Sequence, residues 1–298
     1  MWLDRHDLAW AAGFFDGEGW ASFQARSCRA QINQADPDGV PAVLVKFRRI
    51  VGVGRIAGPE VKEGKIDLYH WVVSSRGDVA RVAELIGPWL GQVKRAELEH
   101  ALGLSLAPMI WPGSSSEELA WAGGFFDGEG STYLLKHRTH PGHLVPVVDV
   151  PQSGNEGVPI ALTRFHTALE FIGSISGPHK YKWAEKPVSR WRTSSRRGVQ
   201  LALHRLWPFI GSVKREQARG VLMVMNSQAD LVRGNPAFGL AGSRYCPKGH
   251  DKLAARLRPY KARKNGGAQR RDSSWCPECL RIYARMYYAR KKAKDATC

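Results

Sequence analysis

The chain has 298 residues, of which 43% are hydrophobic and 24% charged, so it can bury sizeable cores and wholesale disorder is excluded. Its 44 Lys and Arg against 27 Asp and Glu give a net charge of +17, and residues 241–298 carry 16 of these bases but only 4 of the acids. A strongly basic tail on a mildly basic body favours a polyanionic partner, most simply nucleic acid, with a solvated basic surface as the alternative.

A helix is predicted near the N-terminus, because Leu8, Ala11, Ala12 and Phe15 follow helical spacing, and Gly19 is expected to end it. A strand region with one polar face follows, in which bulky and polar residues alternate with Ala21, Phe23 and Ala25. The residues of that face are Trp20, Ser22, Gln24, Arg26, Arg29 and Gln31. Two further helices are predicted at residues 80–85 and 94–104.

The same landmarks then occur a second time. The segment at 8–19 (LAWAAGFFDGEG) returns at 119–130 as LAWAGGFFDGEG, after a linker at 108–117 that is rich in Pro, Gly and Ser. Four more landmarks follow in the same order, up to the Val-Lys-Arg triplets at 93–95 and 213–215. The sequence therefore predicts a duplicated domain and a pseudo-two-fold pair, with repeat 1 at 1–110, repeat 2 at 111–232 and a separate tail at 233–298.

Each repeated motif combines small residues with acids at a helix end. The small residues allow two helix backbones to approach closely, so we expect the two motif helices to pack on each other. Glu18 and Glu129 then lie at C-terminal helix ends, where the helix dipole disfavours an acid by about 0.3–1 kcal/mol. A bound divalent cation would relieve this, whereas the alternative is an exposed acidic turn. Ser115 and Glu118 are expected to form a capping box at the start of the second motif helix.

With these two motifs, AGFFDGEG at 12–19 and GGFFDGEG at 123–130, the sequence resembles the LAGLIDADG homing endonucleases of the single-chain, two-motif type. The resemblance covers roughly residues 5–230. It implies an α+β fold of two αββαββα halves, which meet at the motif helices and bind DNA through antiparallel sheets. It also implies a monomer with internal pseudo-two-fold symmetry, encoded by a mobile intron or a free-standing gene.

The family resemblance assigns roles to paired residues. The last acid of each motif, Glu18 and Glu129, is implied to bind the catalytic Mg²⁺ or Mn²⁺, although the family name has Asp at this place. The first acids of the motifs, implied to be structural, are Asp16 and Asp127. The further pocket residues are Gln34, Gln152, Lys94 and Lys214.

These residue types suit metal-dependent phosphodiester hydrolysis. Carboxylate-held metals activate water and neutralise charge at phosphorus, lysines stabilise developing charge, and glutamines orient the water. Two such sites predict one nick per strand and a staggered double-strand break. A solvated helix position is the alternative for each lysine.

Sequence-specific binding is expected from the polar strand faces, because Arg and Gln can bind G and A edges in the major groove. The candidates are Ser22, Gln24, Arg26, Arg29 and Gln31 in the first copy and Tyr133 and His137 in the second. Exposed strand residues without a role in binding are the alternative.

The tail carries a zinc-binding pattern. Cys246-x3-His250 and Cys276-x2-Cys279 are separated by 25 residues and match a tetrahedral Cys3His site for Zn²⁺. The segment resembles the zinc modules of HNH-type mobile-element nucleases, but no His follows His250, so we expect it to bind DNA without cutting it. Cys28 and Cys298 receive no role.

The leading hypothesis is thus a site-specific DNA endonuclease with an added zinc module. An RNA maturase that assists intron splicing, and a non-catalytic DNA-binding regulator on the same fold, are the alternatives. No run of 18 apolar residues and no signal-peptide pattern occurs, so we expect a soluble intracellular protein without membrane contact, in a bacterial or phage-infected cell or in an organelle.

Overall fold

The computed structural model describes residues 4–24, 27–107, 113–137, 144–154, 157–182 and 184–233. The chain divides into two compact units, Met1–Met223 and Val224–Cys298. Almost all of the described residues belong to the first unit, which contains both repeats of the sequence motif.

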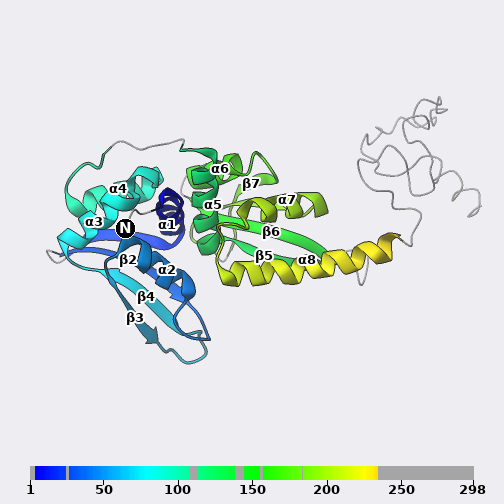
Figure 1. Ribbon diagram of the computed structural model, residues 1–298, viewed down its shortest axis with the longest axis horizontal. Helices are drawn as coiled ribbons and strands as arrows, with labels where there is room; N and C mark the ends of the chain where they lie inside the picture. The colour runs from blue at the N-terminus through cyan, green and yellow to red at the C-terminus, as the bar shows by residue number, and fades with distance from the viewer. Residues whose placement is uncertain are drawn as a thin grey trace, which may run out of the picture. The chain divides into compact units, whose positions relative to one another are not determined.

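The two halves have the same order of helices and strands, apart from a 3-10 turn in the first half (Figure 1). The first half consists of α1 (Arg5–Glu18), β1 (Gly19–Gln24), β2 (Ser27–Ala35), α2 (Ala42–Val51), β3 (Arg55–Glu60), β4 (Leu68–Val73), α3 (Arg76–Ile86), the 3-10 turn η1 (Gly87–Trp89) and α4 (Gln92–Leu102). The second half consists of α5 (Ser115–Glu129), β5 (Ser131–Lys136), β6 (Leu144–Ser153), α6 (Ile160–Ala168), β7 (Ser174–His179), β8 (Val188–Thr193), α7 (Arg196–Leu206) and α8 (Ser212–Arg233).

The strands form two four-stranded antiparallel sheets, in the orders β1-β2-β4-β3 and β5-β6-β8-β7. The predicted α+β class is therefore confirmed. Each half contains one helix more than the expected αββαββα order, because α3 and α4, and likewise α7 and α8, are separate helices.

The two cores repeat the same aromatic packing. Phe47 of α2 meets Trp71 of β4 edge-to-face at 4.7 Å between ring centroids, and Phe165 of α6 meets Trp191 of β8 in the same way at 5.0 Å. Both tryptophans are fully buried. Because alternate residues of a strand point to opposite faces, these tryptophans fix which face of each sheet is covered by helices.

The motif helices α1 and α5 lie side by side between the two sheets (Figure 1). A Cβ atom at Gly13 would lie 1.9 Å from the carbonyl oxygen of Trp121, and one at Gly124 would lie 1.9 Å from that of Trp10. No side chain fits at either position, so the predicted close contact between the motif helices is confirmed. Gly19 is required for a different reason than expected: its backbone is extended, and a Cβ would lie 2.4 Å from the Phe15 ring.

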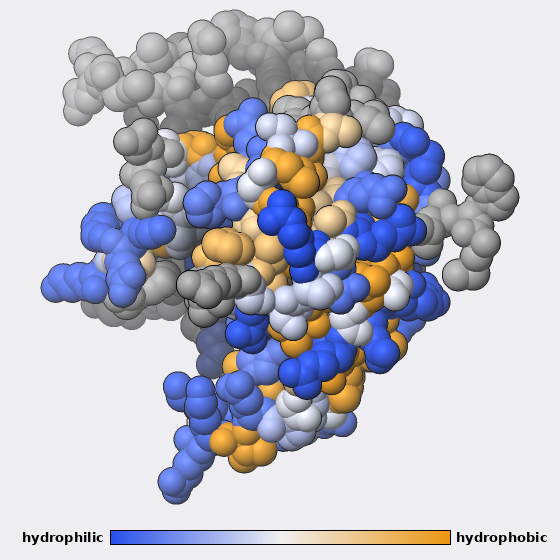
Figure 2. Space-filling view, turned by 90° about the vertical axis from the view of Figure 1, so that its left-hand side faces the viewer, coloured by the Kyte–Doolittle hydropathy of each residue, from blue (hydrophilic) through white to orange (hydrophobic). Residues whose placement is uncertain are grey.

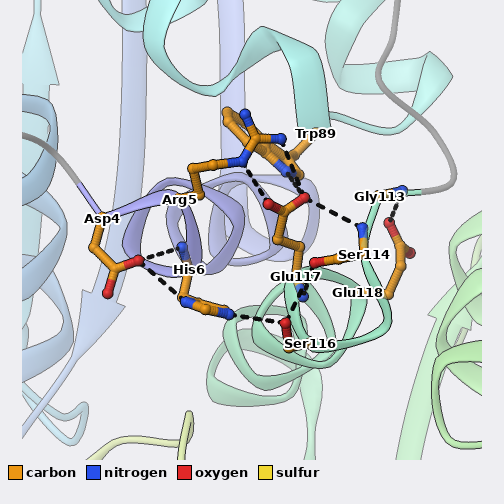
Figure 3. A network of polar contacts seen from close by, with 9 residues as sticks. All are labelled: Asp4, Arg5, His6, Trp89, Gly113, Ser114, Ser116, Glu117 and Glu118. Carbon is orange, nitrogen blue, oxygen red and sulfur yellow. Dashed lines mark hydrogen bonds and ion pairs between the residues drawn. The ribbon is translucent and has the colours of Figure 1, made fainter.

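A polar network joins the N-terminal ends of these helices (Figure 3). The Arg5 Nε donates to Glu117 Oε1 at 2.5 Å, and the indole of Trp89 donates to Glu117 Oε2 at 3.4 Å. Glu117 also forms a capping box with Ser114. The prediction of Ser115 and Glu118 was therefore wrong by one residue. Glu118 instead pairs with the buried Arg164 of α6, at 2.8 Å.

Within the described ranges, no helix has the length and apolarity required to cross a membrane. Hydrophilic and hydrophobic residues are interspersed over the face of the first half that Figure 2 shows.

Candidate active site and nucleic-acid interface

The two motif acids end the paired helices and lie against each other's helix. Glu18 is the last residue of α1 and Glu129 the last of α5. A Cβ at Gly128 would lie 2.9 Å from Cγ of Glu18, and one at Gly17 would lie 3.1 Å from Cγ of Glu129. The glycine before each acid thus makes room for the acid of the opposite helix, which brings the two carboxylates into one site.

This shared site disfavours charge on the acids. Burial, with a smaller contribution from the nearby Glu18 carboxylate, raises the pKa of Glu129 to about 7, while a hydrogen bond with Gln152 acts in the opposite direction. Burial also raises the pKa of Glu18, against a hydrogen bond with Gln34. Each acid therefore has a glutamine of its own half beside it, on β2 or β6.

The two lysines also lie at this site. Lys94 is the third residue of α4 and Lys214 the third of α8. Burial lowers the pKa of Lys214, and the carboxylates of Asp127, Glu18 and Glu129 act against that effect. Both lysines stabilise the charged form of Glu129. The two glutamines and the two lysines of the expected pocket thus all interact with Glu18 or Glu129.

The first acids of the motifs anchor the helices that carry the lysines. The backbone N–H of Gly91, just before α4, donates to both oxygens of Asp16, at 3.0 and 2.8 Å. The N–H of Gly211, just before α8, does the same with Asp127, at 2.8 and 2.9 Å. Burial raises the pKa of each of these acids to about 6, against these hydrogen bonds. Asp16 and Asp127 therefore fix where the lysine-bearing helices begin.

The site offers oxygen donors for a hard divalent cation. Within the described residues, no group of three or more His, Cys, Asp or Glu side chains is arranged to hold a metal ion. Mg²⁺ commonly binds through one or two carboxylates and completes its shell with water and substrate phosphates. The two repelling carboxylates of Glu18 and Glu129 fit that pattern, because a cation between them would remove the repulsion.

The first sheet carries a continuous polar surface on its face away from the core. Trp20 pairs with Gln31 and Ser22 with Arg29, so these four predicted residues share one face. The side chain of Gln31 accepts from Arg29 at 2.6 Å and donates to Asn33 at 2.5 Å. His70 of β4, the register partner of Asn33, lies 2.7 Å from its side-chain oxygen.

The corresponding surface of the second sheet is charged. Asp149 of β6, with a side chain only 4% exposed, lies 3.1 Å from Nε of Arg192 and 3.2 Å from Nη1 of Arg190. The Tyr133 hydroxyl donates to Asp149 at 3.4 Å and accepts from Arg192 at 3.1 Å. The two sheets thus present different chemistry: an arginine with two amides and a histidine in the first half, and two arginines on a buried acid in the second.

Several of these polar residues were not predicted from the sequence. Asn33, His70, Asp149, Arg190 and Arg192 alternate with core residues on β2, β4, β6 and β8. The period of two around the repeated Trp71 and Trp191 was the signal that could have identified the β4 and β8 members.

The remaining predicted residues lie outside these surfaces or outside the described part of the chain. His137 directly follows β5 and is partly buried. Arg26, the side chain of Gln24 and the whole predicted zinc site, Cys246, His250, Cys276 and Cys279, lie outside the described residues. Cys28 is a buried free cysteine whose thiol lies 3.0 Å from the carbonyl oxygen of Ala101.

The sequence matches no model of a known protein family and no curated protein. Among solved structures, the chain is similar to the LAGLIDADG meganuclease I-AabMI bound to uncleaved DNA, at 14% identity over 75% of this chain and 91% of that one, with a TM-score of 0.49. It is also similar to the LAGLIDADG homing endonuclease I-GzeII in complex with its DNA target, at 13% identity over 75% and 92% of the two chains, with a TM-score of 0.48. At such identities a similarity concerns the course of the backbone, and the roles of side chains rest on their contacts.

Proposed function

We propose that the protein is a site-specific DNA endonuclease that uses divalent metal to make a staggered double-strand break in a long recognition site. The observation that carries this proposal is that Glu18 and Glu129 each lie against a glycine of the opposite helix, close enough for the charge of Glu18 to raise the pKa of Glu129. Burying two acids together is unfavourable unless a ligand compensates for it, and divalent cations with phosphate are such a ligand.

The pocket residues divide the chemistry among themselves. Glu18 and Glu129 would hold Mg²⁺ or Mn²⁺, which supplies an activated water and neutralises charge at the scissile phosphate. Lys94 and Lys214 stabilise the negative charge that develops on the phosphoryl oxygens. Gln34 and Gln152 orient the water that attacks phosphorus, and Asp16 and Asp127 position the lysines through Gly91 and Gly211.

The two sheets are the proposed DNA-binding surfaces. Adjacent side chains on one strand face are about 6.6 Å apart, roughly two base-pair steps, so a long site needs several strands from both halves. The different polar surfaces of the two sheets favour an asymmetric target, as expected for a single chain that acts as a pseudo-two-fold monomer. Such a cutting specificity suits a homing endonuclease of a mobile intron or a free-standing gene.

The buried, mutually repelling acids also favour cutting over mere binding. A DNA-binding regulator or an RNA maturase on this fold would need the sheets but would gain nothing from Glu18 and Glu129. The nuclease proposal is therefore tested by incubating the protein with a randomised duplex library and Mg²⁺ and sequencing the ends. We expect staggered ends at one long motif, and no cleavage with EDTA. Intact DNA that the protein nevertheless shifts in a gel would contradict the enzyme and favour a binding protein, with intron RNA tested next.

For the tail we propose a Zn²⁺-bound module that adds phosphate contacts. This proposal rests on the sequence pattern Cys246-x3-His250 and Cys276-x2-Cys279 and on the local excess of Lys and Arg. The purified full chain is expected to carry one zinc per molecule by mass spectrometry under native conditions. Cys279→Ser should lose it, and Cys298→Ser, at a cysteine outside the pattern, should keep it. Zinc retained in Cys279→Ser would contradict this ligand set.

A further inference from the structure

The two lysines of the site occupy equivalent positions but contact different groups. The ammonium of Lys94 lies 3.0 and 3.2 Å from the two carboxylate oxygens of Glu97, one turn further along α4. The ammonium of Lys214 instead donates at 2.6 Å to the carbonyl oxygen of Gly130, directly beside the acid Glu129. Lys94 is therefore directly paired with an acid of its own helix, whereas Lys214 is directed at the end of the motif helix, near the carboxylates of Asp127, Glu18 and Glu129.

A change of residue type at one equivalent position of the two repeats accounts for this difference. The repeat aligns Lys94 with Lys214 at an offset of 120 residues, which pairs Glu97 with Gln217. Gln217 has nearly the same shape as glutamate but no charge, so it cannot form an ion pair with Lys214. Glu97 is further held by the backbone N–H of Ala21 on β1, which donates to Oε2 at 3.4 Å.

We propose that Glu97 restrains Lys94, so that the DNA strand whose phosphate Lys94 contacts is cut more slowly than the DNA strand whose phosphate Lys214 contacts. The proposal rests on the nuclease function proposed above. Glu97 acts as a positioning residue, because it touches Lys94 and not the phosphate. A carboxylate at 3 Å competes with the phosphoryl oxygens for the same ammonium group, and this lowers the positive charge available to the transition state.

The expected consequence is an ordered reaction in which nicked duplex accumulates before the double-strand break. The ion pair is partly exposed, with 19% and 31% of the two side chains accessible, so its effect is limited. Pairs of this kind contribute enough to change a rate roughly two- to fivefold.

The repeat itself supplies a reciprocal test. Glu97→Gln gives the first half the residue of the second, and Gln217→Glu does the opposite, with the same spacing of three residues to the lysine. A duplex selected by the full-length protein is labelled with a different dye on each strand, and both nicking rates are followed in one reaction with Mg²⁺. Lys94→Gln identifies the strand that Lys94 serves, because that strand should lose cleavage first.

We expect Glu97→Gln to speed that strand alone, by roughly two- to fivefold, and Gln217→Glu to slow the opposite strand by a similar factor. A folding defect would change both strands together, so the ratio of the two rates separates restraint from a structural effect. Unchanged ratios, or a slower Lys94 strand in Glu97→Gln, would overturn the proposal while leaving the nuclease intact. No cleavage of either strand by the unmodified protein would instead remove the proposed function, and this inference with it.

Discussion

Trp10 of α1 and Asp127 of α5 come from different halves of the chain, and the indole N–H of Trp10 donates a 2.9 Å hydrogen bond to the Asp127 carboxylate. Trp121 makes the reciprocal bond to Asp16, at 2.8 Å. Because Asp16 and Asp127 also bind the helices that carry the lysines, each half helps to order the active-site helix of the other.

Removing one of these indole donors should destabilise the fold. Trp10→Phe leaves a buried carboxylate with one donor fewer, which costs about 1–3 kcal/mol, and the smaller ring adds a packing loss. Urea denaturation measures the loss. Trp207→Phe is the control, since that partly exposed indole stacks with Arg219. Equal loss in both variants would contradict a specific role for the bond to Asp127.

The close approach of the motif helices makes a second prediction. Gly13→Ala and Gly124→Ala place a methyl group where a carbonyl oxygen lies 1.9 Å away, so the helices must separate. We expect a loss of several kcal/mol or an unfolded chain, as for other overpacked interfaces. Gly220→Ala on α8 has no neighbour within 4 Å and should be neutral or slightly stabilising, because Ala favours helix. The two kinds of variant are compared by thermal unfolding, and tolerance of alanine at Gly13 would contradict this packing.

The raised pKa of Glu129 predicts how stability depends on pH. The folded chain holds this proton up to a pH of about 7, whereas in the unfolded chain the acid ionises near 4.5. Between these values the folded state binds more protons, so the free energy of unfolding falls as the pH rises. Above pH 7, ionisation of Glu129 lowers the free energy of unfolding by roughly 3 kcal/mol relative to its value near pH 4.5.

Glu129→Gln cannot ionise and therefore does not lose stability in this way. In EDTA it should be as stable as the unmodified protein near pH 4.5 and more stable at pH 8, while Asp16 and Asp127 affect both proteins alike. Mg²⁺ should stabilise the unmodified protein at pH 8 and have little effect on the variant. Denaturation curves at the two pH values measure the free energy of unfolding of both proteins. If the two proteins differ by the same amount at both pH values, the burial of a repelling pair is contradicted.

The cluster around Asp149 predicts the base composition of the target. Asp149 contacts Arg192 through Nε and Nη2, which holds the guanidinium in place, and arginine is the side chain that most commonly reads guanine. Selected sites should contain guanine where β8 meets the groove, and adenine is expected opposite Gln31 and Asn33. The two half-sites would therefore differ.

Arg192→Lys should lose roughly 1–3 kcal/mol of discrimination for guanine, and Asp149→Asn should lose part of it, because the guanidinium is no longer held. Sequencing of DNA bound in Ca²⁺ measures the preference without requiring cleavage. Arg219→Lys on α8 is the control for a lost guanidinium. Guanine preference that survives Arg192→Lys would contradict this assignment.

Much of the fold could be predicted because the sequence repeats itself with its landmarks in order. The motif of small residues, Phe-Phe and acids predicted the helix pair that the Gly13 and Gly124 contacts confirm. The capping box could not be fixed, because three consecutive serines, Ser114 to Ser116, offer the same hydroxyl and only backbone geometry selects one.

The asymmetry of the site could not be predicted in this way. Residue type suggested that Lys94 and Lys214 were equivalent, but their partners depend on side-chain conformation and on the neighbouring Glu97 or Gln217. The period of two around Trp191 places the arginines of β8 on one face, but only strand register shows that Arg192 lies opposite Asp149.

The most direct test of the central claim compares Glu18→Gln with Glu129→Gln on a duplex selected by the unmodified protein. Cleavage of both strands is measured in Mg²⁺ and DNA affinity in Ca²⁺, with Glu216→Gln as the same change at an exposed acid of α8. If the two motif acids form one metal-dependent cutting site, each variant will bind the duplex and lose cleavage, and Glu216→Gln will cut normally. Normal cleavage by Glu18→Gln and Glu129→Gln would contradict the account.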